Sequence, residues 1–225
     1  MSGERESIFL YGAGGHARSV AEVIRREGRY EIAAVLDDGR TGSVPGVGEI
    51  LGGVDLLGSL QGRGIRAGFV AIGLNRDREA LIRRVEEHGL RLISPVDPAA
   101  VVAQGVTVGP GSVLMPFCLA GAGSVVGRGV IINTSATVDH DCVIADFVHI
   151  SVGVHFGGAC HVGERSFIGI GAVVGNNIRL GADVTIGASS TVIADVDDGT
   201  FVAGIPARPR TPSTGPRTPE RGDQP

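Results

Sequence analysis

The sequence has no apolar run long enough to cross a bilayer and contains only three cysteines. Three is an odd number, and the cysteines lack metal-like spacing, which argues against a disulfide framework and against a metal site. The formal net charge of -4 gives no electrostatic reason to expect a nucleic-acid partner. The first residues, MSGERES, are polar and charged, so we expect no signal peptide. These absences predict a cytoplasmic protein without a membrane span.

What the sequence does have is a repeat of six residues through its second half. Every sixth residue from Val102 to Val192 is apolar, and we call these sixteen residues the repeat positions. A period of six fits neither an amphipathic helix nor an alternating strand. It is the signature of a parallel β-helix, with three hexapeptides per triangular coil and about five coils here. The repeat positions should point into the prism.

Glycine often follows a repeat position directly. We expect it to give the turn a backbone freedom that a Cβ atom would forbid. The glycines in this position are Gly109, Gly121, Gly127, Gly157, Gly163, Gly169, Gly175, Gly181 and Gly187.

All three cysteines fall four residues after a repeat position, where the repeat otherwise carries small or β-branched residues. Cys118, Cys142 and Cys160 should therefore be buried and act as small apolar fillers. Cys142 is near His140 in the sequence, but its register points it inward. We therefore reject a covalent mechanism through this thiol.

Residues 7–95 follow a different pattern, in which apolar strands alternate with helices. This alternation predicts a parallel, half-Rossmann-like α/β sheet, and Pro95 and Pro98 mark its junction with the β-helix. We expect an α/β domain at 1–95, a β-helix at 96–208 and a disordered tail rich in Pro, Thr, Arg and Gly at 209–225. The expected strands are 7–11, 31–36, 68–73 and 91–96, and the expected helices are one ending near Glu27, one at 54–60 and one at 77–88.

The first strand runs directly into a glycine-rich turn, Gly12-Ala13-Gly14-Gly15-His16-Ala17. The pattern G-x-G-x-x-A between a strand and a helix is the context of a dinucleotide-binding fingerprint, because free N–H groups at a helix start can bind a phosphate. Only about ninety residues are available, whereas a dinucleotide site needs two such halves. We therefore expect one mononucleotide or a nucleotide-linked small molecule. Asp37 and Asp38 either hold hydroxyl groups of the ligand or form a turn at the strand end.

A second group with chemical potential is Asp139-His140-Asp141, just after a repeat position. A neutral imidazole can accept a proton from an amine or hydroxyl, and an adjacent carboxylate can fix its tautomer. The alternative is a solvated surface histidine. Three more histidines, His149, His155 and His161, are six residues apart and should lie on three different sides of the prism, so we do not expect them to bind one metal.

Together these motifs resemble one family. The residues that carry the resemblance are the hexapeptide repeat, the Gly12–His16 turn, Asp37-Asp38, Asn133-Thr134, Asp139-His140-Asp141-Cys142 and Gly204-Ile205-Pro206-Ala207-Arg208. They are similar to the left-handed β-helix acyltransferases that acetylate bacterial sugars, which include N-acetyltransferases of nucleotide-activated amino sugars and sialic-acid O-acetyltransferases. The likeness covers residues 7 to about 209. It implies a left-handed coil and a homotrimer with acetyl-CoA bound along the β-helix between two subunits.

The resemblance also implies roles for individual residues. His140 matches the general base and Asp141 the carboxylate that raises its basicity. Many relatives carry the longer Glu at this position, which makes Asp139 a second candidate. Contacts to acetyl-CoA are implied for His149, Ile170 and Ala188, and contacts to the nucleotide sugar for Gly14, Gly15, His16, Asp37, Asp38 and Asn133. From the missing side chains alone, the backbone at Gly157-Gly158 is a candidate oxyanion site.

Three functions follow as hypotheses. The first is acetyl-CoA-dependent N-acetylation of a nucleotide-linked amino sugar, with direct attack of the amine and His140 as the base. The second is O-acetylation of a sialic-acid-like sugar or another hydroxyl acceptor. The third is a non-catalytic β-helix scaffold or a nucleotide-binding reductase. We favour the first, because the N-terminal turn suits a nucleotide handle.

Overall fold

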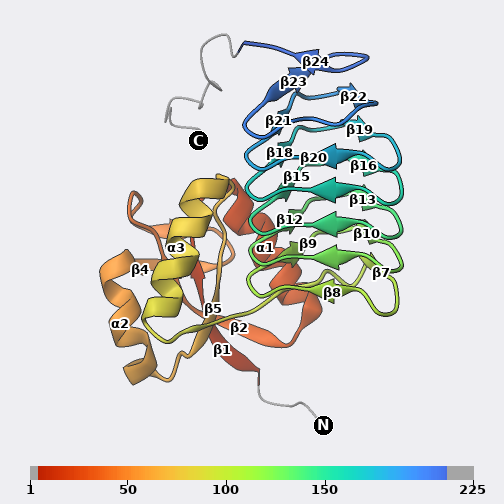
Figure 1. The fold of residues 1–225 in the computed structure, drawn as a ribbon. Coiled ribbons are helices and arrows are strands. Elements are labelled where there is room, and N and C mark those ends of the chain that lie inside the picture. The colour runs from red at the N-terminus through yellow and green to blue at the C-terminus, as the bar shows by residue number, and fades with distance from the viewer. Residues whose placement is uncertain (1–4, 212–225) are drawn as a thin grey trace.

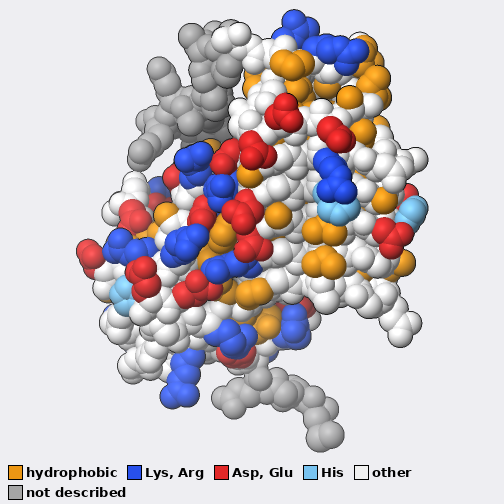
Figure 2. All heavy atoms as spheres, viewed as in Figure 1, with side chains coloured by type: hydrophobic (Ala, Val, Ile, Leu, Met, Phe, Trp, Pro, Cys, Tyr) orange, Lys and Arg blue, Asp and Glu red, His pale blue; other side chains and the backbone are white. Residues whose placement is uncertain are grey.

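The computed structural model describes residues 5–211 of the chain (Figure 1). A unit of helices around a small sheet lies beside a tall stack of coils, and the chain passes from the first to the second after β6. Figure 2 shows acidic and basic side chains mixed over the helical unit and sparser on the coils beside it. No helix within residues 5–211 combines the length and the apolar character needed to cross a membrane.

The first unit contains one sheet in the order β3-β4-β2-β1-β5-β6, parallel except for the β3–β4 pair. Neighbouring residues of β1 point to opposite faces: Ile8 packs on the α1 side, and Phe9 packs with α2 and α3. Burial on both faces explains why this strand is a continuous apolar run. The elements are β1 (Glu6–Tyr11), α1 (Gly15–Glu27), β2 (Tyr30–Leu36), β3 (Ser43–Val44), β4 (Gly48–Gly52), α2 (Leu57–Leu60), β5 (Ala67–Val70), α3 (Asn75–Glu87) and β6 (Arg91–Leu92), with short 3-10 turns at Val54–Leu56 and Gln61–Arg63.

The parallel sheet is as predicted, but four of its strands differ in detail. Strands β3 and β4 were not expected, and β5 and β6 end at Val70 and Leu92, earlier than the predicted ranges. The backbone N–H groups of Ala71 and Ile93 still bond to the neighbouring strands. Beyond them the chain turns toward α3 and toward the coils, so an apolar composition continues where the ladder has stopped.

The coils form three sheets, parallel except for the β23–β24 pair, and we name each sheet after one of its strands. The β13 sheet has the order β22-β19-β16-β13-β10-β7, the β14 sheet β20-β17-β14-β11-β8, and the β15 sheet β24-β23-β21-β18-β15-β12-β9. Thr137 pairs with His155, 18 residues on, so one coil is three hexapeptides as predicted. The strands are β7 (Val101–Val102), β8 (Thr107–Val108), β9 (Val113–Leu114), β10 (Leu119–Ala120), β11 (Val125–Val126), β12 (Ile131–Ile132), β13 (Thr137–Val138), β14 (Val143–Ile144), β15 (His149–Ile150), β16 (His155–Phe156), β17 (His161–Val162), β18 (Phe167–Ile168), β19 (Val173–Val174), β20 (Arg179–Leu180), β21 (Thr185–Ile186), β22 (Thr191–Val192), β23 (Phe201–Ala203) and β24 (Arg208–Pro209).

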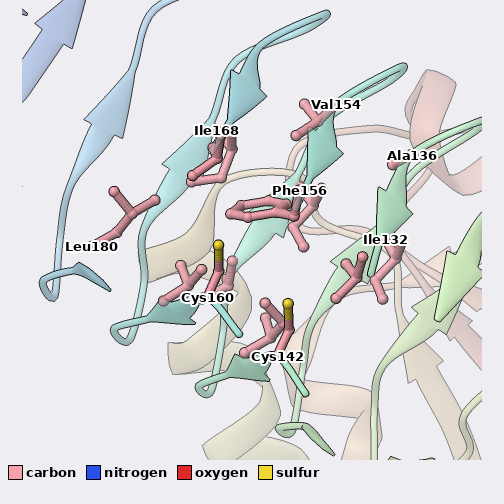
Figure 3. Packing of buried hydrophobic residues seen from close by; sticks show 14 of the residues in the cluster. Ile132, Ala136, Cys142, Val154, Phe156, Cys160, Ile168 and Leu180 are labelled. Carbon is pink, nitrogen blue, oxygen red and sulfur yellow. The ribbon is translucent and has the colours of Figure 1, made fainter. Parts of the chain in front are cut away.

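The repeat positions form the core of the prism. From Leu114 to Val192 every one of them is buried, and Figure 3 shows Ile132, Phe156 and Ile168 converging from the sheets. Val102, the first, is 38% exposed because the first coil has a neighbour on only one side. The interior therefore follows the six-residue period except at the open end of the stack.

The predicted reason for the glycines after repeat positions is wrong. The left-handed backbone occurs two residues later, for example at Asp141 (φ 57°) and Asn177 (φ 60°), and none of these glycines has a positive φ. Most of them are required by close approach between coils instead: a Cβ atom on Gly169 would lie 2.6 Å from the Ile186 carbonyl oxygen, and one on Gly121 would lie 2.6 Å from the Asp139 carbonyl carbon.

This difference predicts which glycine substitutions destabilise the coil. Gly169→Ala places its methyl group against backbone that cannot move freely, so the free energy of unfolding should fall by about 1–3 kcal/mol. Gly175→Ala is the matched control, because its Cβ would have no heavy atom closer than 3.5 Å. Urea unfolding monitored by circular dichroism measures both. Equal effects of the two substitutions would contradict the close-approach explanation.

The cysteines are buried as predicted, and two of them also form hydrogen bonds. Cys142 donates its S–H to the Gly157 carbonyl at 3.4 Å, and Cys160 donates to Gly175 at 3.0 Å. Ser124 makes the equivalent bond to the Asp139 carbonyl at 2.8 Å. Burial raises the pKa of Cys118 to about 12, which disfavours a reactive thiolate.

The first residues of the expected disordered tail are ordered. Pro209 belongs to β24, which pairs antiparallel with β23, and the Arg210 N–H donates to the Phe201 carbonyl at 2.9 Å. The disorder predicted from residue 209 is therefore wrong for residues 209 and 210. Its remaining part, 212–225, lies outside the described residues.

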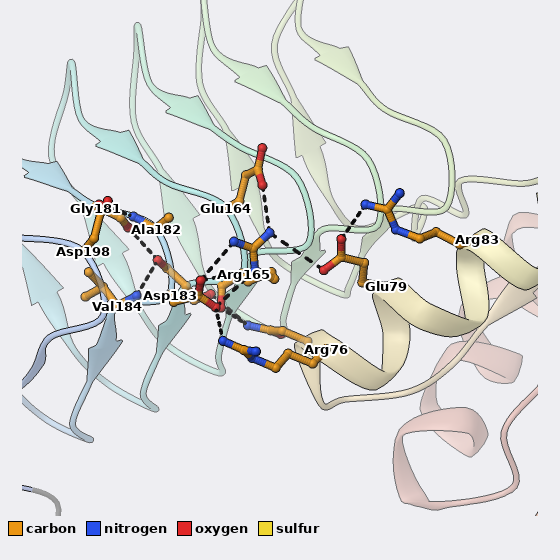
Figure 4. Close-up of polar contacts among 12 residues, drawn as sticks. Arg76, Glu79, Arg83, Glu164, Arg165, Gly181, Ala182, Asp183, Val184 and Asp198 are labelled. Carbon is orange, nitrogen blue, oxygen red and sulfur yellow. Dashed lines mark hydrogen bonds and ion pairs between the residues drawn. The ribbon is translucent and has the colours of Figure 1, made fainter.

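The helical unit packs against the outer face of the β15 sheet. Arg78 of α3 is fully buried there and donates to the carbonyls of Gly129 and Phe147 at 2.7 and 2.8 Å. Nearby, Arg165 pairs with Asp183 at 2.9 Å, and Arg76 reaches the same carboxylate at 3.1 Å (Figure 4). These contacts fix α3, and the loop before it, against the coils.

Candidate active site

His140 is in the corner that follows β13, which we call the first corner. Its Nδ1 atom is 2.8 Å from the Asp141 Oδ2 atom, so the shorter aspartate does reach the ring. The left-handed backbone at Asp141 is one that Asp tolerates better than most residues. Asp139 has another partner, since its Oδ1 atom accepts the backbone N–H of His140 at 2.7 Å. Asp141, not Asp139, orients the imidazole.

This pairing sets the protonation of the ring. The hydrogen bond to Asp141 raises the pKa of His140, and the charge of Asp139 adds to the effect. When Nδ1 donates its proton to Asp141, the Nε2 atom keeps its lone pair. The side chain is 60% exposed, so Nε2 is accessible to a substrate.

Glycines on the adjacent coils make room for the pair. A Cβ atom on Gly158 would lie 2.4 Å from His140 Nε2, and one on Gly123 would lie 2.4 Å from Asp141 Oδ1. The backbone of the corner is held from both sides, because Asp141 N–H donates to Ala122 and Ala159 N–H donates to the His140 carbonyl. Both side chains therefore lie against the stack, in spaces that glycine leaves open.

The N–H groups of the predicted oxyanion site, Gly157-Gly158, both have hydrogen-bond partners in the structure. Gly157 N–H donates to the Val174 carbonyl at 2.9 Å, and Gly158 N–H donates to the Asn176 side-chain oxygen at 3.1 Å. Both N–H groups are thus engaged within the coil. Sequence spacing alone did not reveal that the side chain of Asn176, two coils above His140, contacts Gly158.

The Asp141 contact predicts a specific pH effect. A general base acts in its neutral form, so activity should be lost as the pH falls through the raised pKa of His140. Asp141→Asn removes the charge that raises this pKa, so the acid limb should move to lower pH. The plateau of kcat should also fall about tenfold, because a charge-assisted hydrogen bond is roughly twice as strong as a neutral one. A pH profile of kcat/KM tests this, and an unmoved acid limb would contradict it.

The glycine-rich turn leads into the start of α1. Gly14 is the N-cap residue and makes no side-chain cap, so the first N–H groups of α1 have no capping side chain. Positions Gly14 and Gly15 have open space where a Cβ atom would lie, whereas a Cβ atom on Gly12 would lie 2.8 Å from the Ala71 carbonyl oxygen. The geometry is that of an anion site at a helix N-terminus.

Asp37 and Asp38 make the bonds expected of a strand-end turn. Asp37 accepts the N–H groups of Ala13 and Gly39, both at 2.9 Å. Asp38 accepts hydrogen bonds from the Tyr11 hydroxyl at 2.6 Å and from the Val54 N–H at 2.8 Å. Burial and then the Asp38 hydrogen bond raise the pKa of Tyr11 above its usual value. Asp37 thus holds the glycine-rich turn, and Asp38 links the end of β1 to the segment after β4.

A polar cluster lies between the two units, on the β15 sheet. His149 Nδ1 is 3.1 Å from the Gly73 carbonyl oxygen, and its Nε2 is 3.3 Å from Asn133 Nδ2. His16 is close to it, with 6.4 Å between the ring centroids. Burial and then Arg78 lower the pKa of His149 to about 3, and burial lowers that of His16 to about 4. Both rings are therefore neutral near pH 7.

The predicted site residues fall into two groups within one chain. Asn133, His149 and the glycine-rich turn face each other where α1 meets the β15 sheet, and a groove of about 490 Å³ lies there between α1 and Thr134. Ile170 and Ala188 are exposed on the third corner, which follows the β15 sheet and carries Thr134 two coils below Ile170 and three below Ala188. His140, Asp141, Gly157 and Gly158 follow the β13 sheet instead. No group of three or more potential metal ligands lies together within residues 5–211.

Comparisons with known proteins show which family the chain resembles. Residues 7–85 match the PglD N-terminal domain family, and residues 159–194 match the bacterial transferase hexapeptide family. PerB from Caulobacter crescentus, solved with CoA and GDP-perosamine, is 36% identical, with a TM-score of 0.87 over 91% of this chain and 97% of that chain. The acetyltransferase domain of PglB from Neisseria gonorrhoeae, solved with acetyl coenzyme A, is 41% identical, with a TM-score of 0.87 over 92% of this chain and 100% of that chain.

A curated relative matches over a shorter stretch. GDP-perosamine N-acetyltransferase from Escherichia coli O157:H7 is 30% identical over 84 residues, which are 37% of this chain and 38% of that protein. The two solved relatives, in contrast, align along nearly their whole length. By its sequence identity, its two matched family models and its shared architecture, the chain belongs to the left-handed β-helix sugar acetyltransferases.

Proposed function

We propose that this protein transfers the acetyl group of acetyl-CoA to the amine of a nucleotide-linked amino sugar. The observation that carries the proposal is the His140–Asp141 pair, with its Nδ1–Oδ2 distance of 2.8 Å and the 60% exposed side chain of His140. Relatives solved with CoA and GDP-perosamine, or with acetyl coenzyme A, support the two substrates. GDP-linked perosamine is the first acceptor to test. The proposal places the enzyme in the cytoplasm, where acetyl-CoA is available.

The reaction requires one proton transfer from the amine. The neutral amine attacks the thioester carbonyl carbon, and His140 Nε2 accepts the proton that the nitrogen loses as the tetrahedral intermediate forms. Asp141 stabilises the resulting imidazolium. The intermediate collapses by breaking the C–S bond, and the CoA thiolate takes a proton from the imidazolium. The products are the N-acetyl sugar and CoA with a free thiol.

We assign the remaining residues to binding. The open turn at Gly14 and Gly15 and the start of α1 offer N–H groups to a nucleotide phosphate, and His16, Asp37 and Asp38 border the same turn. Asn133 directly follows β12, and its side chain contacts His149 of the next coil. For acetyl-CoA, we propose His149, Gly157 and Gly158 near the thioester, and Ile170 and Ala188 along the pantetheine arm.

We propose that the working enzyme is a homotrimer with its site between subunits. His140 follows the β13 sheet, whereas the glycine-rich turn lies against the β15 sheet of the same chain. A second copy is therefore needed to bring a base to a bound nucleotide sugar. The β14 sheet also exposes Val125 and Val143, which are 46% and 39% accessible, and such side chains suit contact with another copy. Light scattering in solution should give the mass of three chains.

An acceptor panel tests the proposed function. Purified protein is incubated with acetyl-CoA and with GDP-, UDP- or TDP-linked amino sugars, or with the matching sugars that carry a hydroxyl in place of the amine. We expect release of free CoA thiol only with an amine. Turnover only on hydroxyl acceptors would favour O-acetylation. No turnover, combined with retention on an NAD column and not on a CoA column, would favour a reductase.

A further inference from the structure

One arginine of α3 is buried between the two units without a counter-charge. Arg78 is fully buried, and each of its acceptors is a neutral oxygen. Burying a cation away from any carboxylate costs free energy, which an apolar side chain at a packing contact would avoid. Docking of α3 alone therefore does not explain why this position carries a charge. The acceptors are the carbonyl oxygens of Ile72, Gly73, Gly129, Phe147 and Val148 and the side-chain oxygen of Asn75.

The Gly73 carbonyl links Arg78 to the polar cluster on the β15 sheet. Its oxygen accepts a hydrogen bond from Arg78 Nη1 at 3.1 Å and lies 3.1 Å from His149 Nδ1. A carbonyl oxygen has two lone pairs and no proton to give, so the His149 Nδ1 atom must be the donor in this contact. The proton of the neutral ring therefore belongs on Nδ1.

The other ring nitrogen meets an amide whose direction is also fixed. Asn133 Oδ1 accepts the Thr134 N–H at 2.8 Å, which leaves the Asn133 NH2 group to face the ring, with Nδ2 3.3 Å from His149 Nε2. An NH2 group only donates, so Nε2 must be the acceptor. Both contacts of the ring therefore require the same neutral form, with a proton on Nδ1 and a lone pair on Nε2.

The surroundings of His149 favour this neutral form. Burial and then the charge of Arg78 lower the pKa of His149 to about 3, against the opposing hydrogen bond to Gly73. Besides Arg78, His16 is the titratable group that acts on the ring, and within residues 5–211 no carboxylate does so. A protonated ring would turn an N–H group toward the Asn133 NH2 group and lose that contact. The Arg78 charge thus protects the contact between His149 and Asn133.

This contact leaves one donor for a ligand. One Nδ2 proton of Asn133 faces His149, and the second has no partner within the described part of the chain. We propose that Arg78 is a positioning residue: through the Gly73 carbonyl it holds His149 in the Nδ1–H form, and the ring holds the Asn133 amide for donation to an oxygen of the acceptor sugar. This inference rests on the proposed acetyltransferase function, which assigns Asn133 to the nucleotide sugar.

The form of the ring can be read from the folded wild type. The chain has 6 histidines, so in protein labelled with 15N-histidine the His149 signals are assigned by their loss in His149→Phe. NMR couplings between ring nitrogens and carbon-bound protons then show which nitrogen carries the proton. We expect it on Nδ1, without titration between about pH 5 and 8. A proton on Nε2, or titration in this range, would overturn the proposal.

Three substitutions separate positioning from docking. Arg78→Gln removes the charge but keeps an NH2 donor for the carbonyls, and Arg78→Lys keeps the charge. Arg165→Gln is the matched control, because Arg165 also joins the coils to α3, but through the carboxylates of Asp183 and Glu79. In Arg78→Gln the pKa of His149 should rise. KM for the nucleotide sugar should increase about 2- to 10-fold, the contribution of one hydrogen bond, with kcat little changed.

The expected result is a higher KM and altered His149 signals in Arg78→Gln, with both nearer the wild-type values in Arg78→Lys and Arg165→Gln. An equal KM in the two glutamine variants, with unchanged His149 signals, would leave Arg78 a docking residue only. Should Arg78→Gln fail to fold, the wild-type spectrum decides. The spectra need no turnover, which keeps the two proposals apart. Absence of acetyl transfer to every amine would mean failure of the proposed function, and a proton on Nε2 in an active enzyme would mean failure of the positioning role alone.

Discussion

Replacing His140 with alanine should lower kcat for acetyl transfer by about 10²–10⁴, the usual contribution of a positioned general base. The side chain is exposed and its main packing contact is to Gly158, so the fold should be unaffected. The rate of thiol release at saturating acetyl-CoA and acceptor measures the loss. Circular dichroism and thermal unfolding show whether the coils remain intact.

A second histidine serves as the matched control for this variant. His88 is exposed at the end of α3, where its Nδ1 atom contacts the Arg84 carbonyl at 2.7 Å, and we assign it no role in the reaction. His88→Ala should retain the wild-type kcat. An undiminished kcat in His140→Ala, or an equal loss in both variants, would rule out His140 as the base.

Gly158→Ala is expected to have the second largest effect. Its methyl group would occupy the space of the imidazole, 2.4 Å from Nε2, and His140 would have to rotate away. The ring is the mobile end of an exposed side chain, so the free energy of unfolding should change little. The misplaced base should lower kcat by about 10²-fold, the order of loss that a displacement of about 1 Å can cause.

Comparison with the coil variants makes this result specific. Gly175→Ala meets no close atom, and Gly169→Ala meets backbone away from the first corner. Gly175→Ala should leave both stability and kcat unchanged. Gly169→Ala should lower stability and raise KM for acetyl-CoA, because its methyl group would also lie 2.7 Å from the Ala188 backbone nitrogen, with little change in kcat at saturating acetyl-CoA. If Gly158→Ala instead lowered the unfolding free energy and left kcat unchanged, the glycine would serve packing rather than the base.

The repeat could be predicted because one hexapeptide is one side of the prism. Once the period is known, the inward direction of Cys142 and the separation of His149 from His155 follow by counting. The role of Gly169 could not be obtained this way, because it depends on the distance between coils and not on its own backbone angles. The same is true of Gly157 and Gly158, whose N–H groups are engaged by residues 17 and 18 positions further on.

In the α/β unit, too, some features could be predicted from the sequence and others could not. The strand–turn–helix pattern predicts where Gly14 and Gly15 lie, since an apolar strand must be followed by a turn before α1. It does not reveal how Asp37 and Asp38 are used, because their partners Ala13 and Tyr11 lie on another strand and its turn. It also gives no signal for β3 and β4, which occupy a segment rich in glycine. Contacts between distant segments, not local composition, determine these details.

The most direct test of the account is the chemical bond in the product. The protein is incubated with acetyl-CoA and GDP-linked perosamine, and the acetylated product is isolated and treated with mild base. We predict an acetyl group on nitrogen, which survives as a base-stable amide, formed by the wild type and nearly absent with His140→Ala. A base-labile ester, or an amide formed equally well without His140, would contradict an N-acetyltransferase that uses this histidine.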